Sequence, residues 1–249
     1  MTSFTDWRAE LAALGLFDAN VRVGPSGPQG ALALDAEPLQ RELERFSITR
    51  ALAAHWAGIE YDAASGNRRL AKLQSDWLVP VYAATPEILS EIERLRPRAV
   101  QLSFGALRHN FASAAWGCGE LCEYLQSRRV VTVIGREDLD WEGLARLLAD
   151  FPDLPVVFLN AGYRGDRYLW PLLRRHAHLH FDTSGYLAHR QLEAFVERMG
   201  AERALFGSRL PLFTPGAAVG ALLSARVGDE QRRAVAGGNL RRLLAEVKP

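Results

Sequence analysis

The chain has 249 residues, of which 48% are hydrophobic and 24% are charged, and its formal net charge is +1. These values indicate a globular protein, exclude extensive disorder or collagen-like repetition, and argue against nucleic acid or an anionic membrane surface as a partner. The chain shows no signal-peptide pattern and no apolar run near the roughly 20 residues that span a bilayer, and it has only two cysteines, so we expect a cytoplasmic protein without membrane contact.

Short apolar, β-branched segments alternate with helical patterns along the whole chain. A helix from Thr5 or Asp6 to Gly15 opens it, and a Gly- and Pro-rich loop, 24–30, follows the first strand. The expected strands are 16–23, 48–55, 78–83, 99–104, 129–134, 155–159, 179–183 and 203–206. The expected helices are 38–46, 66–76, 86–95, 112–126, 141–150, 168–176 and 192–199, with two more helical segments within 217–247.

This alternation predicts βαβ units with parallel strands. Eight such units in about 250 residues are typical of a TIM-like (β/α)8 barrel. We therefore expect an α/β protein whose single domain, 1–249, is such a barrel. A doubly wound open sheet is the alternative, although it usually contains fewer strands.

Functional side chains of a parallel barrel lie at the C-terminal ends of the strands and in the loops after them. Because side chains alternate along a strand, Asp18, Asn20 and Arg22 share the face directed to the barrel interior. Polar residues also end several later strands or follow them. The candidate ligand-binding residues are Asn20, Arg22, His55, His109, Asn160 and Arg209.

Five stretches together resemble the metal-dependent amidohydrolases. Residues 17–24, Phe-Asp-Ala-Asn-Val-Arg-Val-Gly, resemble a first strand in which Asp-x-His-x-His supplies two metal ligands. Residues 204–211 resemble the last-strand signature Phe-Gly-Ser-Asp-x-Pro, and 237–244 resemble the closing helix. Residues 155–162 resemble the strand that ends in His-x-Gly, and 180–185 the strand after it. The similarity is greatest to the branch of decarboxylases and lactonases that act on small carboxylated compounds.

The resemblance implies a metal centre, but its ligand positions hold other residues here. The two first-strand histidines stand as Asn20 and Arg22, the later histidine as Asn160, and the last-strand aspartate as Arg209. The middle strand, 131–135, offers no ligand either. Because zinc binds His, Cys and carboxylate groups and a guanidinium has no lone pair to donate, we expect no metal and no other cofactor.

Arg22 and Arg209 are expected to approach the same cavity. Two like charges about 6 Å apart repel by roughly 3 kcal/mol at an effective dielectric constant of about 20, so a negative group must offset them. One hypothesis is internal ion pairing with Asp18, Glu137, Asp138 or Asp182, which would fill an inactive site. The other is a bound anion, since paired arginines recognise carboxylate or phosphate. The sequence leaves both open.

Three functions are compatible with these residues. We favour an amidohydrolase-like barrel without catalysis that binds a small anion or partner subunits. The second is a hydrolase or decarboxylase without a tightly held metal, in which His109 or His55 acts as acid or base beside Arg22 and Arg209. The third is a metal-dependent hydrolase with ligands at other positions. Either histidine could instead be a hydrogen-bonded packing residue. Homo-oligomers occur in the family that the chain resembles, and the apolar stretch 211–227 either covers the barrel or forms an interface.

Overall fold

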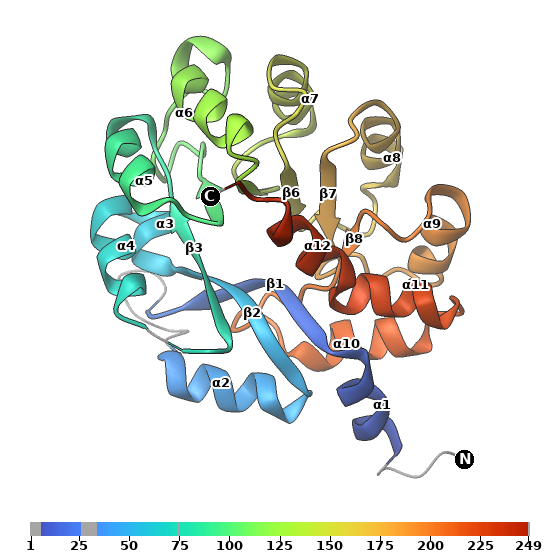
Figure 1. Cartoon of the computed structure of the whole chain (residues 1–249). Helices are drawn as coiled ribbons and strands as arrows, with labels where there is room; N and C mark the ends of the chain where they lie inside the picture. The colour runs from blue at the N-terminus through green and yellow to red at the C-terminus, as the bar shows by residue number, and fades with distance from the viewer. Residues whose placement is uncertain (1–5, 26–33, 74, 249) are drawn as a thin grey trace.

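Eight parallel strands form the centre of the molecule. The computed structural model describes residues 6–25, 34–73 and 75–248, and within them the strands pair in chain order from β1 to β8 (Figure 1). The backbone N–H groups of Ala19 and Arg22 donate to the carbonyl oxygens of Phe206 and Leu210 at 2.8 and 2.9 Å, which joins the first strand to the segment directly after the last. The strands are β1 (Leu16–Val23), β2 (Ile48–His55), β3 (Leu78–Ala83), β4 (Ala99–Leu102), β5 (Val131–Gly135), β6 (Val156–Leu159), β7 (Leu179–Asp182) and β8 (Ala204–Leu205). The predicted (β/α)8 barrel is confirmed.

Helices surround the strands in Figure 1; α1 precedes β1, and the other helices follow strands in the chain. They bury a large apolar core between their inner faces and the outer faces of the strands. The α-helices are α1 (Asp6–Leu14), α2 (Ala36–Arg45), α3 (Trp56–Glu60), α4 (Ala63–Ala71), α5 (Leu89–Leu95), α6 (Ala115–Ser127), α7 (Trp141–Asp150), α8 (Asp166–Arg175), α9 (Gln191–Met199), α10 (Pro215–Ser224), α11 (Asp229–Arg233) and α12 (Asn239–Ala245). A short 3₁₀ helix, Pro86–Ile88, precedes α5, and a π-helical turn, Ala234–Gly238, precedes α12.

The predicted helix 66–76 corresponds to α4, which begins and ends earlier than predicted, and the short helix α3 before it was not predicted. Asp62 begins α4, where its carboxylate accepts the backbone N–H of Ser65 at 2.7 Å. The backbones of α3 and α4 touch: a Cβ on Gly66 would lie 2.1 Å from the Cα of Gly58. The tail has the two predicted helical segments: the first is α10, and the second runs without a break from α11 through the π-helical turn to α12.

A second apolar core fills the barrel interior and continues into α12. Inward-facing residues of the strands, Val79 and Val133 among them, pack in one cluster with Leu240, Leu243 and Leu244 of α12. This helix, dark red in Figure 1, lies over the end of the barrel. The apolar packing therefore closes the N-terminal end and leaves the C-terminal end, or mouth, for polar residues. No helix in the described ranges is both long and apolar enough to cross a membrane.

The closing role of α12 can be tested with Leu243→Ala. Leu243 is only 3% exposed, so its truncation leaves a cavity at the barrel end, and we expect the free energy of unfolding to fall by about 2–5 kcal/mol. Urea unfolding followed by circular dichroism measures the change. Leu107→Ala is the matched control, because Leu107 is 97% exposed and its truncation should change stability by less than about 0.5 kcal/mol. Equal effects of the two substitutions would contradict this role.

Candidate functional site

A buried hydrogen-bond network joins β1, β6 and β7 at the barrel mouth. The Asn20 amide donates to Asp182 Oδ2 at 3.0 Å and to Ser184 Oγ at 3.2 Å, and its Nδ2 lies 3.4 Å from Asn160 Oδ1. Ser184 Oγ donates to Asn160 Oδ1 at 2.9 Å, and the Asn160 backbone N–H donates to Asp182 Oδ1 at 2.7 Å. The structure therefore brings two of the predicted residues, Asn20 and Asn160, to one point, with Asp182 as their shared acceptor.

Asp18 lies on β1 beside this network and is fully buried. Its Oδ1 accepts the backbone N–H groups of Asn20 at 2.9 Å and Ser208 at 3.0 Å, whereas its Oδ2 contacts no donor among the described residues. Burial raises the pKa of Asp18 to about 7, hydrogen bonds from Ser208 and Asn20 oppose the shift, and Asp182 adds to it. Burial also raises the pKa of Asp182. The floor of the mouth thus holds two carboxyl groups with raised pKa values.

Three arginines gather above these carboxyl groups. Arg108 Nη1 lies 2.7 Å from Asp138 Oδ2, and Arg108 Nη2 lies 3.8 Å from Glu137 Oε1. Arg209 Nη2 lies 3.9 Å from the same Glu137 oxygen. Arg22 shares this field, since Glu137 and Asp138 attract its charge while Arg108 and Arg209 repel it. The structure thus places Arg22 and Arg209 in one cluster, as predicted, and adds Arg108.

The arginine cluster outnumbers its carboxyl partners. Arg22 is 6% exposed, its Nη1 donates to the Val21 carbonyl at 3.2 Å, and within the described ranges it forms no ion pair shorter than 4 Å. Burial lowers the pKa of Arg22 to about 10, which leaves it charged near neutral pH. Internal ion pairs thus offset the charge of Arg108 and, at a longer distance, that of Arg209, but they do not offset the charge of Arg22.

The pKa values of the two acidic partners, Glu137 and Asp138, are shifted in opposite directions. Burial alone would raise the pKa of Glu137, but hydrogen bonds from its own backbone and from Asn160, with Arg22 and Arg209 nearby, hold it below its usual value. Burial raises the pKa of Asp138 to about 6 despite its contact with Arg108. Glu137 therefore stays ionised near neutral pH, and Asp138 is the weaker counter-charge.

The two candidate histidines both contact α3. His55 Nδ1 accepts the backbone N–H of Ala57 at 3.1 Å, which caps the helix, and His109 Nε2 lies 2.7 Å from the Gly58 carbonyl oxygen. Burial, followed by the charge of Arg69, lowers the pKa of His55 and keeps its ring neutral. These hydrogen bonds fit a packing role, and they link the histidines to α3 rather than to Asn20 or Arg22.

The donor set at the mouth does not fit a divalent metal. Guanidinium groups at Arg22 and Arg209 have only N–H donors, and Asn160 Oδ1 already accepts from Ser184. Asp182 accepts N–H groups through both of its oxygens. In the part of the chain that the structure describes, no three His, Cys, Asp or Glu side chains are grouped as metal ligands. A metal at this place would need a different arrangement of these side chains.

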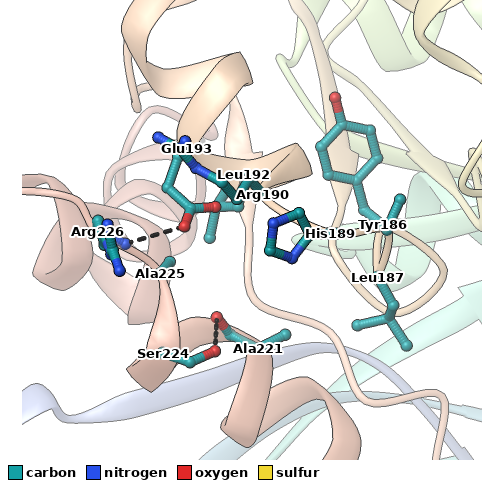
Figure 2. Close-up of a pocket in the computed structure, with 11 residues that line it drawn as sticks. Tyr186, Leu187, His189, Arg190, Leu192, Glu193, Ala221, Ser224, Ala225 and Arg226 are labelled. Atoms are coloured by element: carbon teal, nitrogen blue, oxygen red, sulfur yellow. Dashed lines mark hydrogen bonds between the residues drawn. The ribbon is translucent and has the colours of Figure 1, made fainter.

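Figure 2 shows another cavity, of about 480 Å³, between the loop after β7 and the end of α10. The His189 ring lies near its centre, and on one side Glu193 Oε1 accepts the backbone N–H of Arg226 at 3.2 Å. None of the six predicted site residues lines this cavity. It is therefore separate from the arginine cluster at the mouth.

Sequence reasoning identified four members of the mouth site and missed others. Glu137, Asp138 and Asp182 were expected only as counter-charges, and Arg108 was not singled out. Arg108 lies in the loop after β4, and the general rule that functional groups follow barrel strands could have found it. Its distance from Asp138, however, depends on loop geometry that no sequence pattern encodes.

The chain matches a known protein family. The sequence model of the family described as amidohydrolase matches residues 18–245. No curated protein matches the chain. The match spans β1 to α12 and therefore includes every element that forms the mouth.

Several solved structures share the fold. An uncharacterised TIM-barrel protein from Bordetella bronchiseptica is 18% identical, with a TM-score of 0.74 over 93% of this chain and 98% of its own. A 5-carboxyvanillate decarboxylase from Sphingomonas paucimobilis is 16% identical, with a TM-score of 0.73 over 93% and 99%. A putative 2-pyrone-4,6-dicarboxylic acid hydrolase from Pseudomonas putida is 16% identical, with a TM-score of 0.70 over 94% and 98%. At these identities the similarity shows the fold alone.

The buried carboxyl of Asp18 should make stability depend on pH. Its pKa rises from 3.8 to about 7 on folding, so its contribution is complete below about pH 4 and is lost as pH rises to about 7. Asp18→Asn keeps the shape and removes the titration. We expect the variant to gain a few kcal/mol relative to the wild type across that interval, measured by urea unfolding at a series of pH values.

Asp76→Asn is the control for this experiment, because Asp76 is exposed. The stability difference between this control and the wild type should stay nearly constant with pH. A difference between Asp18→Asn and the wild type that is equally flat would show that the Asp18 carboxyl does not hold its proton in the folded state.

Proposed function

The chain belongs to the amidohydrolase family, and from this membership and the charge at the mouth we propose that its barrel binds a small carboxylate or phosphate at Arg22 and Arg209. Asn20 and Asn160 form the floor of the proposed site, and we propose His55 and His109, which contact α3, as further members. We propose that residues 1–249 form one domain, that it acts in the cytoplasm, and that its partner is a small molecule rather than nucleic acid or a membrane.

The observation that carries this proposal is the unpaired charge of Arg22. A buried guanidinium without a carboxylate partner is costly, and a bidentate carboxylate or phosphate would offset that cost. Arg108 and Arg209 already share Glu137 and Asp138, so the cluster has one more cation than internal anions. A monoanionic group bound at Arg22 would balance the cluster.

The character of the ligand follows from the surroundings of the arginines. Exposed apolar side chains, Leu107 and Phe213, lie in the loops after β4 and β8, and Arg209 stacks over the Phe213 ring at 5.5 Å. A carboxylate on an apolar or aromatic body would contact both kinds of group. Two structural neighbours are named for carboxylated compounds of that kind, which favours carboxylate over phosphate.

Loss of the metal centre is part of the same proposal. We infer that arginine replaces the metal charge at Arg22 and Arg209 and that the barrel has lost the hydrolytic chemistry of its family. The proposed role is then binding of a small carboxylate, or of a partner subunit that presents one.

The alternative is an active hydrolase or decarboxylase for a small carboxylated compound. It is supported by the family match and by neighbours named as decarboxylases and a hydrolase. In this reading the arginines hold the substrate carboxylate, and His109 or His55 exchanges the proton, with or without a metal held by a different set of ligands.

Binding can be measured by isothermal titration calorimetry with 5-carboxyvanillate and 2-pyrone-4,6-dicarboxylate. We expect one of them to bind the wild type and Arg22→Gln to weaken that binding at least about tenfold, because a charge-assisted hydrogen bond contributes about 1.5–3 kcal/mol. Arg41→Gln is the matched control, since Arg41 is exposed on α2 and pairs with the exposed Glu37. Binding that is unchanged in Arg22→Gln would refute the site.

Metal content and turnover separate the two functions. After incubation with zinc and manganese and then desalting, plasma mass spectrometry should find far less than one metal ion per chain. Turnover of the same two compounds should stay at background. A stoichiometric metal would restore a metal-dependent hydrolase, and turnover abolished by His109→Ala would establish the alternative enzyme.

A further inference from the structure

A second cationic cavity lies at the opposite end of the barrel from the mouth. It has a volume of about 200 Å³ and lies beneath α12, beside the N-terminal ends of β5, β7 and β8. Its polar lining consists of three arginines, two histidines and two acids: Arg129, His178, His180, Glu202, Arg203, Arg242 and Glu246. The volume suits a tetrahedral oxyanion with its waters, since one water occupies about 30 Å³ of the liquid.

Three arginines line this cavity against two carboxylates, Glu202 and Glu246. Glu246 is the shared carboxylate partner, with its Oε2 2.6 Å from Arg129 Nη2 and its Oε1 3.7 Å from Arg242 Nη1. Arg203 instead donates through Nη1 to the carbonyl oxygens of Leu173 and His176 at 2.8 and 2.7 Å. Within the described chain, no carboxylate lies within 4 Å of Arg203. The cavity thus presents guanidinium donors that its own acids do not saturate.

His180 adds a hydrogen-bond acceptor to this cationic lining. It is 4% exposed, and its Nδ1 lies 3.2 Å from the His178 carbonyl oxygen. A carbonyl only accepts, so Nδ1 carries the hydrogen and Nε2 keeps its lone pair. Burial lowers the pKa of His180 to about 4, with Arg242 and Arg203 adding to the shift and Glu246 opposing it, so the ring is neutral. No described residue donates to Nε2.

We propose that this cavity binds a small oxyanion that keeps a hydroxyl of its own, with hydrogen phosphate as its type. The guanidinium groups of Arg203 and Arg242 donate to the charged oxygens, and the ligand hydroxyl donates to His180 Nε2. Sulfate has the same shape and charge but no hydroxyl near neutral pH. It would place an oxygen lone pair against the lone pair of Nε2, and the site selects against it on that ground.

This site is independent of the one proposed at the mouth. The apolar interior that includes Val133, Val157 and Leu243 lies between the two ends of the barrel. Leu243 itself also lines the second cavity. Substitutions at the mouth should leave the second cavity intact, so the two proposals can fail separately.

The test compares inorganic phosphate with sulfate at about pH 7, by isothermal titration calorimetry on the full chain. The protein carries Arg22→Gln and Arg209→Gln together, so that the mouth does not contribute. We expect phosphate to bind and sulfate to bind about tenfold or more weakly, since sulfate leaves the Nε2 acceptor unpaired. Equal affinities, or no phosphate binding at about 10 mM, would overturn the proposal.

Two variants assign the selectivity to named groups. His180→Phe keeps the volume but removes the acceptor, so phosphate should lose its advantage over sulfate. Glu246→Gln removes the competing carboxylate from Arg129 and Arg242, so phosphate should bind several-fold more tightly, a gain that misfolding cannot produce. Selectivity that survives His180→Phe, or a phosphate affinity that does not rise in Glu246→Gln, would contradict the assignment.

Discussion

Closure of an eight-stranded barrel leaves little room inside, and this constraint governs what each inward-facing residue can be. An inner layer is stable either when apolar side chains fill it or when every polar group in it finds a partner within the same layer. The chain combines the two, although Asp18 Oδ2 and the Gln101 amide contact no hydrogen-bond partner among the described residues. Valines and leucines, with α12, fill the interior from the N-terminal end, and Asn20, Asn160 and Asp182 satisfy one another at the other end. The polar layer rests on the apolar one, which keeps Asp18 away from water.

The balance of charges at the mouth follows from this arrangement of a polar layer on an apolar one. Burial makes ionised carboxyl groups costly on the floor, and the raised pKa values of Asp18 and Asp182 reflect the cost. These two groups are consequently weak counter-charges for the arginines above them. Glu137 stays ionised because Asn160 and the arginines stabilise it, but it is shared between Arg108 and Arg209. Arg22 therefore lacks a counter-charge because the barrel keeps too few of its nearby acids ionised.

The strands and the mouth were predictable to the extent that they follow general rules. β-branched apolar segments identify strands such as β1 and β2, and Asn20 of β1 contacts Asp182 of β7, as expected of an inward-facing residue. The contacts of His55 and His109 were not predictable, because both depend on α3, a five-residue helix too short for any periodicity to reveal. Arg108 was not predicted as a site residue for a similar reason, since its pairing with Asp138 depends on the path of two loops.

The two cationic ends of the barrel differ in the competition that a ligand meets. An anion at the mouth finds Arg22 without a carboxylate and Arg209 only loosely held, with Glu137 3.9 Å away. An anion beneath α12 competes with Glu246, which holds Arg129 at 2.6 Å. The affinity of each end is therefore set less by the number of arginines than by the internal pair that must open. On that ground the mouth binds a carboxylate more readily than the N-terminal cavity does. The N-terminal cavity instead selects between anions through His180. Its neutral ring is a hydrogen-bond acceptor among cations, so it distinguishes anions by whether they carry a hydroxyl rather than by their charge.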